Sequence, residues 1–225
     1  MRTFYINSII KKLFVKLLGR ASHRDSNIFI SRPDAFSNFL PLALTDTKLK
    51  EVIDSKDEFI RAVISGRVKL SDFGNVFKAL VQGRDFIDLC CGDPLISTYP
   101  RFFAQAFGAR QYKGVDLNYV SNEVVKGEYS EFPEFESEYH NMDLLDFLKA
   151  EVSQKNGTVI YLSGIEPLNQ SRAENYIKSC EVEIVRLIKN GGAVIIAQGT
   201  YGFDFAKHNL KLMTEKPHHK VYSHK

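Results

Sequence analysis

From residue 84 onward, short apolar runs alternate with longer stretches whose apolar residues recur at helical spacing. Five strands are predicted: residues 86–89, a strand that ends at residues 114–116, and residues 139–142, 158–162 and 193–197. The last two are rich in β-branched residues, which is typical of strands buried on both faces of a parallel sheet. Residues 171–189 form the clearest of the intervening amphipathic helices. This alternation of strands and helices predicts an α/β fold built around a mostly parallel sheet.

Residues 1–83 differ, because their apolar residues recur at helical spacing and no comparable strand run interrupts them. Helices are expected at residues 46–64 and 71–83, and Ser71 is a good N-cap for the second of these. We interpret residues 1–83 as an N-terminal helical extension, a cap attached to an α/β domain at residues 84–225.

The first 24 residues predict a basic amphipathic helix, with six Lys or Arg residues and no acid. Three interpretations stay open. The helix packs on the α/β domain or against a second subunit, it lies on a membrane surface or another anionic partner, or it is an organelle-targeting segment.

Composition narrows the class of protein further. With 225 residues and 44% apolar content, the chain can bury one substantial core, and its net charge of +3 does not by itself indicate nucleic acid. Of three cysteines, Cys90 and Cys91 are adjacent, and no spaced Cys/His array is present, which argues against a disulfide framework and a zinc site. No apolar run reaches the length needed to span a bilayer. We therefore expect a cytoplasmic protein in a reducing compartment.

The most informative stretch is residues 84–118, which predicts a strand, a tight turn, a helix and a second strand. Gly92 lies in the turn, and Asp116 ends the second strand. A glycine there lets the backbone approach a ligand, and the acid can accept hydrogen bonds from ribose hydroxyls, so the unit suits an adenosine-containing ligand. A dinucleotide-binding pattern aligned on Gly92 would require glycines where Cys90 and Leu95 stand, which disfavours a nicotinamide enzyme.

Residues 88–94, Asp-Leu-Cys-Cys-Gly-Asp-Pro, resemble the first motif of class I S-adenosylmethionine-dependent methyltransferases, Asp/Glu-x-Gly-x-Gly-x-Gly. Cys90 stands in place of the first glycine and Pro94 in place of the last. Residues 189–192, Lys-Asn-Gly-Gly, resemble that family's late motif before its fifth strand. Two alternating segments at 210–216 and 220–224 resemble the antiparallel hairpin that closes the family's sheet.

The resemblance implies a Rossmann-like, doubly wound, mostly parallel seven-stranded sheet with a C-terminal antiparallel hairpin. It also implies S-adenosylmethionine as the cofactor, with Asp143 at the adenine amino group and Met142 along the adenine face. Eight positions are implied to bind the cofactor: Asp88, Cys90, Gly92, Asp116, Leu117, Met142, Asp143 and Ser163.

The residues themselves leave other roles open for the acids. Asp88 could cap the turn that follows it, Asp116 could be a solvent-facing acid at a strand end, and Asp143 could cap the next helix.

Catalysis is expected near the segment that follows the fourth strand, which in the resembling family faces the transferable methyl group. Methyl transfer from a sulfonium is an in-line displacement, so alignment supplies much of the rate and a general base is optional. Glu166 is the candidate base, although it could equally be a carboxylate at a helix start beside Pro167. The Asn/Asp-Pro-Pro-Tyr/Phe motif of enzymes that methylate exocyclic base amines is absent.

These observations predict methyl transfer to a small-molecule acceptor. A protein or RNA acceptor, a non-catalytic binding or scaffold protein of the same fold, and an NAD-dependent Rossmann enzyme are the alternatives.

Overall fold

A computed structural model of the chain describes residues 43–45, 56–91, 99–117, 135–162, 174–197, 203–216 and 219–224. All of them belong to the second of two units into which the chain divides, residues 39–225. The predicted basic helix of residues 1–24 lies outside the described residues, as does Pro94.

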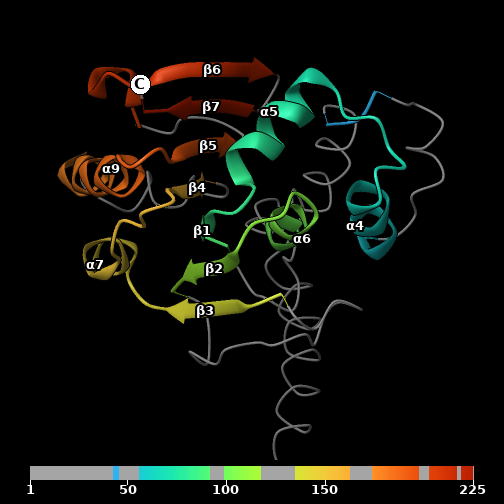
Figure 1. Cartoon of the computed structure of the whole chain (residues 1–225). Coiled ribbons are helices and arrows are strands. Elements are labelled where there is room, and N and C mark those ends of the chain that lie inside the picture. Colours follow the sequence, from blue (N-terminus) through green and yellow to red (C-terminus); the bar gives the residue numbers. More distant parts are fainter. Residues whose placement is uncertain are drawn as a thin grey trace, which may run out of the picture. The chain divides into compact units, whose positions relative to one another are not determined.

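Seven strands form one sheet in the order β3-β2-β1-β4-β5-β7-β6 (Figure 1). They are β1 (Asp85–Leu89), β2 (Gln111–Asp116), β3 (Ser137–Asn141), β4 (Thr158–Leu162), β5 (Ala193–Ala197), β6 (Lys211–Lys216) and β7 (His219–Ser223). The first five strands are parallel to one another, and β7 runs antiparallel to both β5 and β6. The predicted mostly parallel sheet with a closing hairpin is therefore confirmed.

Helices cover both faces of this sheet, as a doubly wound fold requires (Figure 1). They are α4 (Lys56–Ile64), α5 (Asp72–Val81), α6 (Tyr99–Ala106), α7 (Leu144–Ala150), α9 (Glu174–Ile188) and the short 3₁₀ helix η1 (Phe205–His208). Figure 1 shows α7 and α9 on one face, and α5 and α6 on the other. Both α4 and α5 belong to the same unit as the sheet. The boundary at residue 83 between a helical extension and the α/β domain stays a prediction. Among the residues that the structure describes, none of the helices is both long and apolar enough to cross a membrane.

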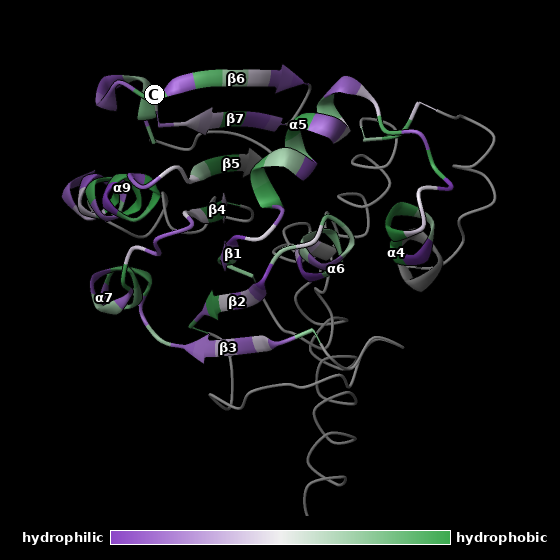
Figure 2. Cartoon of the chain, in the orientation of Figure 1, coloured by the Kyte–Doolittle hydropathy of each residue, from purple (hydrophilic) through white to green (hydrophobic). Residues whose placement is uncertain are grey.

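The face under α7 and α9 is aliphatic. Figure 2 shows the hydrophobic side of α9 turned toward the sheet. The buried side chains of this cluster come from four strands and both helices, and include Ile87, Leu89, Val115, Ile160, Leu162, Val194, Leu148, Ile184 and Leu187. The alternation of side chains along each strand places this set on one face, where burial of its apolar surface stabilises the sheet.

The opposite face is aromatic. Phe86 of β1 packs against Tyr112 of β2, with ring centroids 6.2 Å apart, and against Tyr161 of β4 at 5.6 Å. Tyr112 in turn packs against Tyr139 of β3 at 5.7 Å. Four neighbouring strands therefore present rings to the helices that cover this face, and α5 adds Phe77, which packs on Phe107 at 5.2 Å just after α6.

Local signals set the ends of several elements. The Ser71 side chain accepts a hydrogen bond from the Gly74 backbone N–H at 3.0 Å, which confirms the predicted N-cap of α5. The third strand begins at Ser137, two residues before the predicted start at Tyr139. This extension is tertiary in origin, because the backbone N–H of Tyr112 donates to Glu136 O at 3.0 Å and the buried Ser137 hydroxyl binds Arg101.

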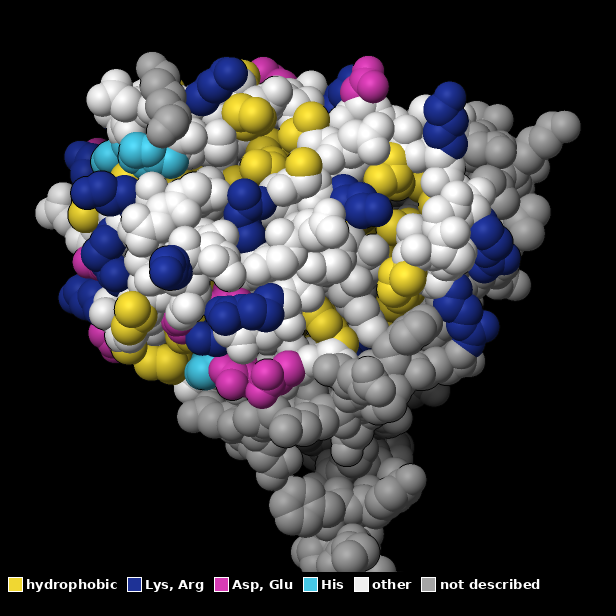
Figure 3. Space-filling view, in the orientation of Figure 1, with side chains coloured by type: hydrophobic (Ala, Val, Ile, Leu, Met, Phe, Trp, Pro, Cys, Tyr) yellow, Lys and Arg dark blue, Asp and Glu magenta, His cyan; other side chains and the backbone are white. Residues whose placement is uncertain are grey.

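The hairpin leaves β6 as an edge strand that exposes Leu212 and Met213, 44% and 40% of whose surface is accessible. Figure 3 shows hydrophobic side chains over this part of the molecule among Lys and Arg side chains. The pairing of β6 with β7 shifts register between Leu212 and Thr214, and Lys211 and Lys216 stand at its two ends. A bulge and flanking lysines are ordinary protection against pairing with another chain.

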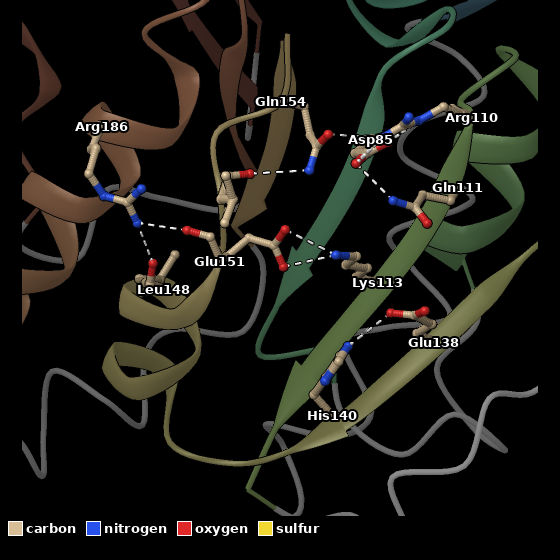
Figure 4. A network of polar contacts seen from close by, with 11 residues as sticks. Asp85, Arg110, Gln111, Lys113, Glu138, His140, Leu148, Glu151, Gln154 and Arg186 are labelled. Atoms are coloured by element: carbon tan, nitrogen blue, oxygen red, sulfur yellow. Dashed lines mark hydrogen bonds and ion pairs between the residues drawn. The ribbon is translucent and has the colours of Figure 1, made fainter. Parts of the chain in front are cut away.

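A polar network ties the amino ends of β1 and β2 together (Figure 4). Asp85, which is 1% exposed, accepts hydrogen bonds from Nε and Nη2 of Arg110, both at 2.6 Å, and from Nε2 of Gln111 at 2.8 Å. The hydrogen bond to Asp85 and its negative charge hold the pKa of Arg110 above its ordinary value. Lys113 and Glu151 add a half-buried ion pair at 2.9 Å between β2 and the end of α7.

Candidate functional site

The carboxyl ends of β1, β2 and β3 meet at one edge of the sheet. Leu89 pairs with Val115, and Asp116 pairs with Asn141, so the three parallel strands end nearly level. The strand order reverses between β1 and β4, next to this edge. In open α/β sheets, ligands bind outside the carboxyl ends of the strands at such a switch point.

The topology brings six of the predicted site residues to this edge or just below it: Asp88, Cys90, Asp116, Leu117, Met142 and Asp143. The remaining three, Gly92, Ser163 and Glu166, lie outside the described residues.

Asp88 is fully buried inside β1, where its backbone pairs with Gly114 on one side and Tyr161 on the other. It points to the aromatic face, because it follows Phe86 by two residues. Its Oδ2 accepts a hydrogen bond from the hydroxyl of Tyr112 at 2.8 Å. A buried carboxylate needs polar partners to offset the cost of its burial, and the Tyr112 hydroxyl is one of them.

Cys90 has a left-handed backbone, with φ of 61°. The resembling motif has glycine at this position, and the structure shows why glycine would suit it. A side chain in this conformation costs about 1–2 kcal/mol, so the turn after β1 stores strain. The chain then rejoins the sheet, because the Cys91 N–H donates to Val115 O at 3.2 Å.

Gly114 explains how the second cysteine fits beneath this turn. A Cβ built on Gly114 would lie 2.8 Å from Cys91 Sγ and 2.8 Å from Cδ1 of Tyr139, closer than real Cβ contacts come. Cys91 is only 1% exposed and fills the space that glycine leaves. Gly114 is therefore required by packing beside the turn.

Asp116 and Leu117 form the end of β2. Asp116 is the last residue of the strand and is half-buried, while Leu117 is 52% exposed. By the alternation of side chains, Asp116 shares the face of Tyr112 and Gly114. An edge carboxylate beside an exposed apolar side chain suits a ligand that combines hydroxyl groups with a planar ring.

Asp143 caps α7, which confirms that part of its predicted role. Its Oδ1 accepts hydrogen bonds from the backbone N–H groups of Leu145 at 2.9 Å and Asp146 at 3.4 Å. The same oxygen accepts a hydrogen bond from the hydroxyl of Tyr176, on α9, at 2.8 Å. Met142, immediately before, is half-buried and packs against the aliphatic cluster.

Tyr176 is a residue that the sequence reasoning missed, since it counted only as one apolar position of a helix. Burial, reinforced by the hydrogen bond to Asp143, holds the pKa of Tyr176 well above its usual range. The phenol is therefore a proton donor at neutral pH and fixes the orientation of the Asp143 carboxylate. Tyr112 was missed as well, because nothing local marks a tyrosine that will face an aspartate on the next strand.

No family model matches the chain, and no curated protein matches it. Two kinds of solved structure match part of the chain. The bifunctional kinase-methyltransferase WbdD is 15% identical with a TM-score of 0.45, and the match covers 76% of this chain and 39% of the WbdD chain. A candidate methylase from Haemophilus influenzae, HI0767, is 14% identical with a TM-score of 0.40, and the match covers 66% of this chain and 83% of that one. This chain thus spans about two-fifths of WbdD. Likeness at this level does not assign the chain to a family.

Proposed function

We propose that the chain is an S-adenosylmethionine-dependent methyltransferase that acts on a small-molecule acceptor. One observation carries the proposal: β7 is inserted antiparallel between β5 and β6, in a sheet whose other strands follow the order of a nucleotide-binding fold. That hairpin is what the sequence resemblance implies for class I methyltransferases, and simple nicotinamide-binding halves lack it. It therefore supports the methyl donor over NAD.

The chemistry of the carboxyl edge fits the proposed cofactor. Asp116 would accept hydrogen bonds from the ribose hydroxyls, and the exposed Leu117 beside it would cover part of the adenine ring. Asp143 is oriented by the cap of α7 and by Tyr176, and it would accept a hydrogen bond from the adenine amino group. Asp88 and the turn at residues 90–92 would hold the methionine end.

Bound S-adenosylmethionine supplies a methyl group on a sulfonium, which is already a good leaving group. The chain's own contribution is then to bind, to align donor and acceptor, and to exclude water, since proximity supplies much of the rate enhancement. Glu166 is the proposed base for a protonated acceptor, and Ser163 is proposed to face the cofactor from the segment after β4. The proposed acceptor is a small molecule, because the sequence contains no recognisable nucleic-acid module.

Isothermal titration of the full chain with S-adenosylhomocysteine tests the proposal. We expect saturable binding, which Asp116→Ala weakens by about 1–3 kcal/mol because it leaves the ribose hydroxyls unpaired. Glu215→Ala is the matched control, since this carboxylate lies on the edge strand β6 and pairs only with the exposed Lys220 among the described residues. It should leave the affinity unchanged.

Three outcomes would contradict the proposal or change it. A folded chain that binds no S-adenosylhomocysteine is not this enzyme, and saturable NADH binding in its place would favour the nicotinamide alternative. Binding without formation of S-adenosylhomocysteine from S-adenosylmethionine, across a panel of purified metabolites, proteins and RNA, would favour a non-catalytic protein of the same fold.

A further inference from the structure

Arg101, in the first turn of α6, is fully buried. Its Nε donates a hydrogen bond to the hydroxyl of Ser137, on β3, at 2.7 Å. The rings of Phe102 and Phe135 lie 5.6 and 5.8 Å from its guanidinium carbon. These contacts hold the guanidinium in one place and orientation.

The outer nitrogens of the same guanidinium are not satisfied. Nη1 and Nη2 are both buried and have no hydrogen-bond partner within the part of the chain that the structure describes. An arginine stays positively charged inside proteins, and aromatic rings stabilise the charge but accept no fork of N–H bonds. Arg110 shows the ordinary solution, because its fork binds both oxygens of Asp85.

The position of Arg101 along α6 makes the charge less favourable still. It is the third residue of an eight-residue helix whose first turn contains no acid. The positive end of a helix dipole repels a cation and attracts an anion. A buried unpaired charge and an unfavourable helix end are two independent costs, and one bound anion would offset both.

Gln105 supplies an unused acceptor on the same helix. It lies four residues after Arg101, on the same side of α6, and its Oε1 is buried without a hydrogen-bond partner among the described residues. A donor fork and an unused acceptor on one helix face would together suit an anionic group that carries a nearby N–H or O–H.

We propose that Arg101 forms a buried oxyanion site, in which Nη1 and Nη2 donate in parallel to two oxygens of a carboxylate or phosphate on a small ligand. Gln105 accepts from a neighbouring donor of that ligand. The site does not depend on the proposed methyl transfer. Ser137 begins β3, at the amino end of the sheet, whereas the proposed cofactor lies at the carboxyl ends of the strands, so the oxyanion is not the methionine carboxylate of the donor.

The test measures the melting temperature of the full chain in sodium phosphate or sodium acetate, with sodium chloride of equal ionic strength as the reference. We expect a saturable rise with at least one oxyanion for the natural chain, and no such rise for Arg101→Met. In chloride, Arg101→Met should melt no lower than the natural chain, because an apolar side chain replaces an unpaired buried charge. Arg101→Lys keeps the charge without the fork and should weaken the apparent oxyanion affinity about tenfold or more.

Arg110→Lys is the matched control, since the Arg110 guanidinium already binds a carboxylate of the chain, that of Asp85. It should lower the melting temperature in every buffer and keep the oxyanion response. The proposal is overturned if the natural chain melts alike in oxyanion and chloride, or if Arg101→Met keeps the response, which would indicate adventitious ions only. It is also overturned if Arg101→Met melts well below the natural chain in chloride, because the partner is then an acid of the chain itself.

A second measurement checks that this site is separate from the proposed cofactor site. Arg101→Met should leave the affinities for S-adenosylhomocysteine and for 5′-methylthioadenosine, which lacks the carboxylate, unchanged. A loss of about tenfold or more for S-adenosylhomocysteine alone would assign the guanidinium to the donor's carboxylate and overturn the separation of the two sites. If neither nucleoside binds, methyl transfer fails as a proposal, and the phosphate and acetate titrations still decide the oxyanion site.

Discussion

Two aspartates toward opposite ends of β1 have different hydrogen-bond partners. Asp85 and Asp88 are both buried in this strand, three residues apart. At the amino end, Asp85 is neutralised by the double hydrogen bond to Arg110 and by Gln111. Toward the carboxyl end, Asp88 accepts a hydrogen bond from the neutral hydroxyl of Tyr112. A carboxylate matched by a cation from the chain stabilises the fold, whereas the proposed function assigns Asp88 to the ligand.

The surroundings of the two ends follow the same division. Lys113 with Glu151, and Arg186 with the carbonyl oxygens at the end of α7, hold the elements near the amino side of the sheet (Figure 4). The carboxyl side instead shows Cys90, whose backbone is left-handed. Backbone strain of this kind is common at functional sites, where the surrounding structure offsets its cost.

The largest effect should come from the amino end. Arg110→Ala leaves the buried Asp85 carboxylate without its cation, and we expect the free energy of unfolding to fall by about 3 kcal/mol. The side chain of Arg110 is half exposed, so water moderates the loss. Urea denaturation measures the stability, and isothermal titration should show unchanged S-adenosylhomocysteine affinity. A loss of ligand affinity equal to that of Asp116→Ala would erase the distinction between the two ends.

Tyr112→Phe tests the partner of Asp88. Removing one hydroxyl takes a hydrogen bond from a buried carboxylate, so we expect a loss of about 2 kcal/mol in the free energy of unfolding. The same substitution made in an Asp88→Asn chain should cost clearly less, because the two residues are coupled. Equal losses in both backgrounds would mean that the 2.8 Å contact contributes little.

Tyr176→Phe tests whether the hydrogen bond to Asp143 matters for ligand binding at the carboxyl edge. We expect a loss of only about 1 kcal/mol in stability, because the α7 cap still holds Asp143. Affinity for S-adenosylhomocysteine should fall by a similar amount, since the Asp143 carboxylate loses one of the hydrogen bonds that orient it. Asp146→Asn, an exposed carboxylate in the same helical turn, is the binding control. Loss of affinity in both variants alike would indicate a general effect on α7.

Cys90→Gly should have the smallest effect, and it should be stabilising. Relief of a left-handed side chain gains about 1–2 kcal/mol, and the greater freedom of glycine in the unfolded chain takes back up to about 1 kcal/mol. We therefore expect a net gain of about 0.5 kcal/mol in urea denaturation. Cys90→Ala keeps the strain and should bring no gain, whereas a gain from alanine would mean that the sulfur, and not the backbone, is the unfavourable feature.

Much of the fold could be predicted because its signals are local. The runs at residues 158–162 and 193–197 became β4 and β5 at the predicted bounds. Ser71 and Asp143 cap the helices that follow them, because a capping side chain reaches only two or three residues along the chain. The carboxyl edge was predictable for a related reason, since parallel strands must end at a common edge.

The sequence by itself thus determined most of the strands, two helix caps and the acids at or near the carboxyl ends of β1, β2 and β3. Only the tertiary structure decided which side chains those acids and cations meet: Asp88 and Tyr112 are 24 residues apart, Asp143 and Tyr176 are 33 apart, and Arg101 and Ser137 are 36 apart. Arg101 lies in the helix predicted between the first two strands, where no local signal marks it as a buried charge. Periodicity and capping depend on residues within one or two turns of the chain, whereas these pairs depend on strand register and on how the helices pack against the sheet.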